Sequence, residues 1–416
     1  MLALQPSAAL IQLPSATNPT VTFCRGMGQC NESYSAITGQ LLVQEKPAIW
    51  LVTLHKNLFM GFPGRIFTSL FGFALAVLLI SGFIMNRHKI AAMMRLPRKD
   101  NLRLFLHDLH NGLGLWCYPW LILFAVTGAL SGLGALGTVG LAHRVSPDNP
   151  QAVMQQLMGG FHPIAEQTNT QRYHTPQQAL DYLHQSYPNF IAQTLIIQDK
   201  SWVISGVRVN QPSTSNFEQY QVEDGYFVGI RDSAQQAFWT RAFISIQPLH
   251  YGQYQWLPHI ESFLSAMHFI AGFSGCVLVA SGLAMWCWRR ATLRISGLIV
   301  GCCGGLLLSI STLLMLMSLS LSLSMSLFFL FWGGSVLVCI TINNAHRMLI
   351  LMAALSASLL LTACFFSLWR QPASFSRIDF ALLLSGLFLL LTLGCIWKLS
   401  PTQKGARSEY ERSITK

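Results

Sequence analysis

The sequence predicts a mainly α-helical fold: a polytopic membrane bundle of about seven transmembrane helices, with a small α+β domain outside the bilayer. Hydrophobic residues make up 52% of the chain and charged residues only 10%, whereas soluble domains carry about 25% charged residues. Crossing a hydrocarbon core of roughly 30 Å takes about 20 apolar residues in a helix. Seven stretches meet this requirement: 62–86, 111–135, 260–287, 293–317, 321–341, 347–368 and 378–397.

Positive charge orients these helices. The loop 87–103 carries six Lys or Arg residues against one Asp, so the positive-inside rule places it in the cytoplasm. The polar segment 142–246 carries six Lys or Arg and eight Asp or Glu residues, and we expect it on the outer side. The formal charge of +11 therefore reflects membrane orientation, and we expect no nucleic-acid partner.

The segment 142–246 predicts the α+β domain. Thr175 and Pro176 supply the cap residue and first-turn proline of a helix, which Pro188 ends. Period-two patterns of β-branched and aromatic residues then predict strands joined by turns, the last turn being Glu-Asp-Gly. The predicted strands are 194–198, 202–209, 217–222 and 226–230.

Residues 20–45 resemble the end of a second such module, because short apolar runs flank a turn region rich in Gly, Asn and Ser. This region holds Cys24 and Cys30 on the expected outer side, where disulfide bonds persist, so a bridge between them is predicted. Residues 1–50 contain neither an apolar span nor a signal peptide. Either the chain inserts with its N-terminus outside, or a helix precedes this sequence, and we favour the second interpretation.

The expected organisation has six parts. These are a remnant of a first α+β module (1–50), two transmembrane helices with a basic cytoplasmic loop (51–141), the outer domain (142–246), a third transmembrane helix (247–290), four additional helices (291–400) and a cytoplasmic tail (401–416). The four additional helices have almost no ionisable interior residues, which argues against a transport path through them.

Part of the chain recurs about 200 residues later. Each copy has a Leu-His pair and a proline before or at the start of a span, and Gly-Phe, Val-Leu and Ser-Gly pairs within it. The matched residues are Leu54-His55, Pro63, Gly72-Phe73, Val77-Leu78 and Ser81-Gly82 in the first copy, and Leu249-His250, Pro258, Gly272-Phe273, Val277-Leu278 and Ser281-Gly282 in the second. A further segment places His107 and His110 at the start of another span. Histidine at or inside a bilayer is costly to keep, so these residues are functional-site candidates.

The order of these motifs resembles the PepSY-associated transmembrane family. The motifs are Asp108-Leu-His110-Asn-Gly and Leu249-His250-Tyr-Gly at two helix starts, and Ser35-Ala-Ile-Thr-Gly39 and 222–230, which are similar to the closing strand of PepSY modules. The resemblance covers roughly residues 20–290. It implies a bacterial inner membrane, with the domain 142–246 in the periplasm, and a link to siderophore iron uptake such as ferric-siderophore reductases have. The first of the family's four core helices, which bears a histidine, has no counterpart in this sequence.

Histidines on neighbouring helices suit haem b, because an electron-transfer haem needs an axial nitrogen on each face. His55 and His250 are related by the repeat and precede their spans on the same side, so we expect them to face each other at an outer haem. Glycines would give the macrocycle room. Gly128 lies 18 residues after His110 and therefore on the same helix face, and His268 shares a stripe with Gly272. The same glycines equally suit tight helix packing.

His110 lies near the inner end of its span and is the candidate ligand of a second, inner haem. In the family pattern its partner would be the histidine of the absent first helix. His107, His88 or His268 could take that place, or the inner site could be empty. Structural roles stay open too: helix capping for His55 and His250, interhelical hydrogen bonding for His110, and headgroup contact for His107. His268 has Thr68 at the matching position of the repeat, which favours a structural role for it.

We therefore expect a reductase with one or two haems b that passes electrons outward to a ferric chelate, such as a ferric siderophore. The sequence has no flavin or nicotinamide motif, so the electron donor would be a quinol or a separate reductase. Two alternatives remain: a non-catalytic membrane protein whose outer domain regulates a protease or another partner, and a component of an iron or chelate transporter.

Overall fold

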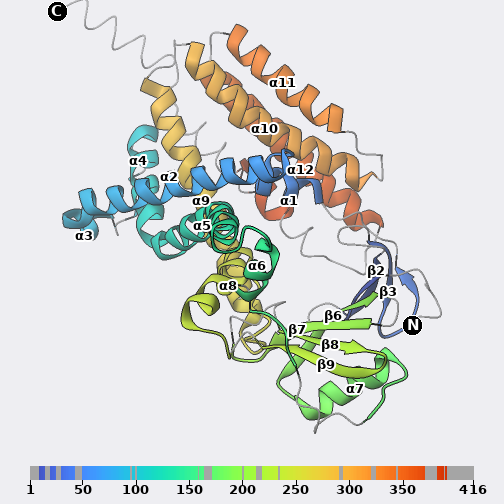
Figure 1. Ribbon diagram of the computed structural model, residues 1–416. Coiled ribbons are helices and arrows are strands. Elements are labelled where there is room, and N and C mark those ends of the chain that lie inside the picture. The colour runs from blue at the N-terminus through green and yellow to red at the C-terminus, as the bar shows by residue number, and fades with distance from the viewer. Residues whose placement is uncertain are drawn as a thin grey trace, which may run out of the picture. The chain divides into compact units, whose positions relative to one another are not determined.

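A computed structural model describes most of the chain, whose course Figure 1 shows. The described residues are 9–14, 19–24, 30–42, 49–93, 96–98, 101–157, 159–163, 171–198, 201–211, 218–232, 235–289, 294–319, 325–342, 345–370, 382–387 and 389–390. The chain divides into two compact units. The first unit comprises residues 1–84 and 118–273, and the second comprises residues 85–117 and 274–416.

Five of the described helices are long and apolar enough to cross a membrane. They are α2 (Gly61–Asn86), α5 (Tyr118–Val145), α9 (Glu261–Arg289), α10 (Arg294–Ser318) and α12 (Ala345–Arg370). These apolar stretches fold as helices because a helix satisfies its own backbone hydrogen bonds where no water is present. At the predicted span 321–341 stands α11 (Met325–Thr341), which is apolar but shorter. Most of the predicted span 378–397, and the whole tail 401–416, lie outside the described residues.

The predicted span 111–135 is divided between two helices. α4 (Leu102–Trp116) ends at Cys117, and α5 begins at the next residue and continues past the predicted end to Val145. Pro119 accounts for the break, because proline lacks an N–H donor and its ring clashes with a preceding helical turn. His107 and His110 therefore belong to the separate helix α4.

The predicted α+β domain is present in the first unit, and its four predicted strands are confirmed as β6 (Phe190–Gln198), β7 (Ser201–Arg208), β8 (Glu218–Glu223) and β9 (Tyr226–Arg231). The sheet is larger than predicted, however. Five more strands join it: β1 (Leu10–Gln12), β2 (Thr20–Cys24), β3 (Cys30–Ser35), β4 (Leu41–Leu42) and β5 (His162–Pro163). In the described part of the chain the strand order is β4-β3-β2-β1-β6-β7-β8-β9-β5, all antiparallel. β1 pairs with both β2 and β6, so the described strands before residue 50 and the four predicted strands form one continuous sheet.

Local sequence explains the ends of these elements. Thr175 caps α7 (Pro176–Ser186) by accepting a hydrogen bond from the Gln178 N–H. Asp224 and Gly225 both have positive φ, 47° and 88°, as the two-residue hairpin turn between β8 and β9 requires. α7 lies beside the sheet (Figure 1) and packs its buried face into a core that also contains Ile204, Tyr220 and Phe227.

Cys24 lies at the end of β2 and is disulfide-bonded. The residue opposite it in the β2–β3 ladder is Cys30. This register fits the predicted bridge between the two cysteines, on a hairpin at one end of the sheet.

Two short helices that the sequence analysis did not predict carry the repeated histidines. α1 (Ile49–Asn57) has His55 in its last turn, and α8 (Phe238–Tyr251) has His250 in its last turn. α8 ends in a left-handed cap at Gly252, with φ of 65°, which glycine adopts without steric cost. Each histidine therefore stands at the end of a helix that leads into a spanning helix, α2 or α9.

In the second unit, α10 packs against α11 and α12. Glycines make this approach possible: a Cβ at Gly301 would lie 2.7 Å from the Cα of Val336, and one at Gly304 would lie 2.9 Å from the sulfur of Met352. Close packing of small residues is the usual way in which helices associate in lipid. The described additional helices thus form a bundle of their own.

A buried ion pair stabilises one corner of the sheet. Glu218 is fully buried, and its Oε1 accepts hydrogen bonds from Arg208 Nη2 at 2.6 Å and from the Tyr220 hydroxyl at 2.9 Å. Its Oε2 has no hydrogen-bond partner. Burial raises the pKa of the Glu218 carboxyl, and the bonds from Arg208 and Tyr220 oppose this rise. The backbone N–H of the nearby Asn210 donates to the carbonyl of Trp256 at 2.7 Å, so this corner of the sheet also holds the segment that follows α8.

We expect Arg208→Met to lower the free energy of unfolding of the sheet domain by about 3 kcal/mol, because it leaves a buried carboxylate without its cation. Adding Glu218→Gln removes that charge and should restore most of the loss. Pulse proteolysis of the detergent-solubilised chain over a urea series measures both variants. Equal losses in the single and double variants would mean that the packing of the Arg208 side chain matters and its charge does not.

Candidate functional site

The two repeated histidines lie side by side in the first unit. The ring centres of His55 and His250 are 6.3 Å apart, and their planes differ by 16°. His250 is half-buried and His55 is exposed. The structure thus brings together, from α1 and α8, the two residues that the repeat relates.

Residues of α5 form hydrogen bonds with the ring of His250. Its Nδ1 lies 2.9 Å from the hydroxyl oxygen of Thr127, and the carbonyl of Phe124 also accepts a hydrogen bond from the ring. The Thr127 hydroxyl itself donates to a backbone carbonyl one turn earlier in α5, so its oxygen accepts the proton of Nδ1. With the proton on Nδ1, the lone pair of Nε2 is available to a metal, as in other histidine ligands oriented by a second hydrogen bond.

His250 is also in the protonation state that a metal requires. Burial, reinforced by the nearby His55 and His268, lowers the pKa of His250 to about 4. The imidazole is therefore neutral at physiological pH, and neutral imidazole is the form that binds metal ions.

Gly128, the residue after Thr127, allows the ring to approach the helix. A Cβ at this position would lie 3.1 Å from His250 Cε1, closer than a side chain normally comes. The prediction that Gly128 shares a helix face with His110 is wrong, because α4 ends at Cys117 and the two residues belong to different helices. In the first unit Gly128 makes room for the ring of His250.

His110 is held in the same way within the second unit. Its Nδ1 lies 3.0 Å from the carbonyl oxygen of Leu278 and 3.1 Å from the hydroxyl oxygen of Ser281. Ser281 donates its own proton to the Leu278 carbonyl. A Cβ at Gly282 would lie 3.1 Å from His110 Cε1.

His250 and His110 are each held by three contacts at equivalent positions of a spanning helix. Each histidine binds a hydroxyl residue, lies against the glycine that follows it, and bonds to the carbonyl three residues before it. Sequence reasoning selected the histidines but missed Thr127 and Ser281 as their partners. The usable signal was a hydroxyl-Gly pair on a spanning helix, which occurs at Thr127-Gly128 and at Ser281-Gly282.

His268 supports His250 from a different direction. The hydroxyl of Tyr254 lies 3.1 Å from His268 Nδ1, and the carbonyl of His250 accepts a hydrogen bond from the His268 ring. The ring also stands edge-on to Phe124, with centres 4.6 Å apart. His268 thus contacts the backbone of His250 at the end of α8, an arrangement suited to positioning the candidate ligand.

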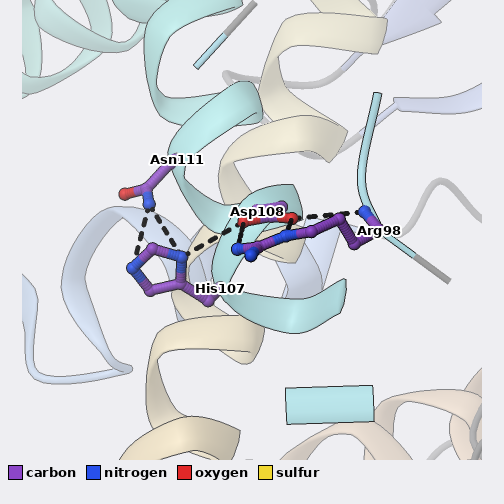
Figure 2. A network of polar contacts seen from close by, with 4 residues as sticks. All are labelled: Arg98, His107, Asp108 and Asn111. Atoms are coloured by element: carbon purple, nitrogen blue, oxygen red, sulfur yellow. Dashed lines mark hydrogen bonds and ion pairs between the residues drawn. The ribbon is translucent and has the colours of Figure 1, made fainter. Parts of the chain in front are cut away.

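His107 belongs to a polar network on α4, which Figure 2 shows. Asp108 accepts hydrogen bonds from the Arg98 side chain at 2.7 and 2.9 Å, and the Arg98 guanidinium holds the pKa of Asp108 well below its usual range. His107 Nδ1 lies 3.3 Å from Asp108 Oδ1, and the Asn111 amide nitrogen lies 3.2 Å from His107 Nε2. The His107 side chain is 58% exposed. Among the described residues of the second unit, His110 makes no ring contact with His107 or His88.

The donor set favours haem over a bare metal ion. No group of three or more His, Cys, Asp or Glu side chains that could hold an ion occurs in the described part of the chain, and a bare ion usually needs about four protein ligands. Haem iron needs only two, because the porphyrin supplies the rest. Two imidazoles bound to one metal at about 2 Å have ring centres about 6 Å apart, since each centre lies ~1.1 Å beyond its nitrogen. The distance of 6.3 Å between the ring centres of His55 and His250 matches this separation.

In the described part of the chain, five helices able to span a membrane and the antiparallel sheet together define a multi-pass membrane protein with an α+β domain. The chain belongs to the family of the PepSY-associated TM region, whose model matches residues 14–290. It is similar to the uncharacterized protein PA4219 of Pseudomonas aeruginosa, with 42% identity over 279 residues that cover 64% of this chain and 71% of that protein. The family resemblance inferred from the histidine motifs is confirmed, and the match includes all five candidate ligand histidines.

Proposed function

We propose that this protein binds haem b in a bacterial inner membrane and passes electrons to a ferric chelate, such as a ferric siderophore, on its outer side. The observation that carries the proposal is the His55–His250 pair, with its ring separation of 6.3 Å and with His250 Nδ1 engaged by Thr127. The donor would be a quinol or a separate reductase. The positive charge of the loop 87–103 supports an orientation with the sheet domain in the periplasm.

Each residue has a defined task in this proposal. His55 and His250 would hold the haem iron, and Thr127 and Phe124 orient the ring of His250. His110, oriented by Ser281, is the candidate ligand of a second haem in the second unit. When bound, haem supplies reversible one-electron chemistry, while the protein supplies ligation, orientation and tuning of the potential.

The reaction would move one electron from the donor to the Fe(III) of the chelate and yield Fe(II). Hard oxygen ligands hold Fe(II) less tightly than Fe(III), so reduction promotes release of iron. If the donor is a quinol, it would give up two electrons, one to each of two ferric chelates, would become a quinone, and would release two protons to water on the side where it is oxidised.

Reduction of a ferric chelate by haem-loaded protein in liposomes tests this function. A quinol is incorporated in the membrane, the ferric chelate is supplied outside, and a coloured Fe(II)-specific chelator reports the product. We expect Fe(II) formation that depends on the protein and is lost in His250→Ala. Haem-loaded protein that yields no more Fe(II) than empty liposomes, both with the quinol and with dithionite enclosed in place of a separate reductase, would contradict the reductase function.

Thr127→Val should weaken haem binding at the outer site about 10- to 100-fold, the usual cost of losing the residue that orients a metal-bound histidine. The substitution keeps the shape of the side chain but removes the oxygen that accepts the Nδ1 proton of His250. Thr138→Val is the matched control, because Thr138 lies on the same helix and bonds only to the carbonyl of Gly134. Haem titrations followed by absorbance compare the two, and equal affinities would remove Thr127 from the site.

A further inference from the structure

The spanning helix α2 carries a basic residue, Arg65, whose partly buried position the packing of the fold does not account for. Arg65 lies in the second turn of α2 and donates from Nη2 to the hydroxyl of Ser131 at 3.0 Å. Its Nε is buried and has no hydrogen-bond partner. Within the part of the chain that the structure describes, no carboxylate forms an ion pair with it. A cation in a membrane helix with an unused donor is costly, and such residues mark functional sites.

Arg65 is close to the histidine pair by way of α5. Ser131, its hydrogen-bond partner, lies one turn after Thr127, which holds His250, and four residues of helix rise about 6 Å. The same stretch of α2 contacts both sides of the site. Ser69 donates to the carbonyl of Gly128, and Thr68 donates to the carbonyl of Lys56, the residue after His55.

We propose that the guanidinium of Arg65 binds a carboxylate of the group held between His55 and His250, namely a propionate of haem. This inference rests on the proposed function. Haem presents two propionates at one edge, and guanidinium is the side chain whose planar set of donors matches a carboxylate. The bound carboxylate takes the unused Nε donor and neutralises the cation inside the membrane. Arg65 thereby fixes the direction in which the haem edge points.

The simpler alternative is that Arg65 only extends its charge toward the lipid headgroups, as basic residues near helix ends do. The two accounts differ in one respect. Only if Arg65 binds a propionate does its contribution to haem affinity depend on whether the carboxylates of haem are ionised or esterified.

Titrations of two haems against the protein with Arg65 and against its variants separate these accounts. Apoprotein in a His110→Ala background, so that only the outer site binds, is titrated with haemin and with haemin dimethyl ester, in which both carboxylates are blocked. The same titrations are made with Arg65→Met and Arg65→Lys. Arg87→Met is the matched control, because Arg87 follows the opposite end of the same helix. Absorbance gives the affinities, and a redox titration gives the midpoint potential of the bound haem.

We expect esterification to weaken binding to the Arg65 protein at least tenfold, as for the loss of a charge-assisted hydrogen bond. Arg65→Met should bind haemin at least tenfold more weakly and should no longer distinguish haemin from its ester, while Arg65→Lys falls between. The midpoint potential should be lower in Arg65→Met, because a nearby cation favours the reduced haem.

Two results would overturn the inference while leaving the proposed function intact. One is equal binding of haemin and its ester to the protein that retains Arg65, a test that needs no Arg65 variant to fold. The other is a loss of affinity in Arg65→Met that is the same for both haems, which would indicate a packing role alone. If the Arg65 protein binds haemin with no spectrum of an imidazole-ligated haem, the proposed function fails together with this inference.

Discussion

His250→Ala should remove one haem from the protein and weaken haem binding at the outer site by more than 100-fold. Loss of a residue that merely orients a metal ligand costs 10- to 100-fold, and His250 is expected to donate the bond itself. Its ring is the buried member of the pair, with Nδ1 occupied by Thr127 and with its pKa lowered to about 4 by burial. His55→Ala should have the same consequence, because each histidine is expected to supply one face.

The specificity of this loss is measured with two controls. His259→Ala changes an exposed histidine in the segment between α8 and α9 and should retain all haem. His110→Ala should retain the outer haem and lose only what the second unit holds. Haem per chain and the dissociation constant of added haemin are the readouts. Full haem content in both His55→Ala and His250→Ala would remove this pair from the account.

Gly128→Val should disable the outer site without removing any ligand. A Cβ at Gly128 would already lie 3.1 Å from His250 Cε1, and the two γ carbons of valine need more space still. The ring would have to leave Thr127 and turn away from His55, so haem affinity should fall by at least tenfold, comparable to the loss of an orienting partner. Haem titration together with the size-exclusion profile distinguishes loss of the site from loss of the fold.

Gly137→Val provides the matched comparison on the same helix. A Cβ at Gly137 would meet no atom within 4 Å, so this substitution carries the same cost of placing a β-branched residue in α5 and spares the histidine. We expect its haem content to equal that of the parent protein. If the two glycine variants lost haem equally, the close approach at Gly128 would not be the cause.

The sequence predicted the spanning helices and the strands well, because both follow from local patterns. Long apolar runs can cross a membrane only as helices, and period-two patterns predicted β7, β8 and β9 to within one residue at each end and the last five residues of β6. The single sheet could not be predicted in this way. β1 is three residues long, and its pairing with both β2 and β6 depends on contacts between segments that are nearly 200 residues apart.

The candidate site was predicted only in part, because some of its residues are marked by a sequence pattern and others are not. The repeat related His55 to His250, and the structure places their rings 6.3 Å apart. The helices α1 and α8 that present them were missed, and so was the partner Thr127 on α5, because a hydroxyl-Gly pair in an apolar helix becomes informative only once the helix is known to face a histidine. The break at Cys117 was missed as well, although Pro119 was available as its signal. The residue that orients a ligand, such as Thr127, is found from the geometry of the structure, whereas the repeated histidines can be found from the sequence.

Haem bound per chain tests the central claim most directly. The protein is expressed with adequate haem supply and purified in detergent, and a reduced-minus-oxidised visible spectrum is combined with pyridine haemochrome quantitation. We predict the sharp α-band of a b-type haem and at least one haem per chain, reduced by one in His250→Ala. Purified, folded protein with no bound haem would contradict the account, and a regulatory role of the sheet domain would then be the better explanation.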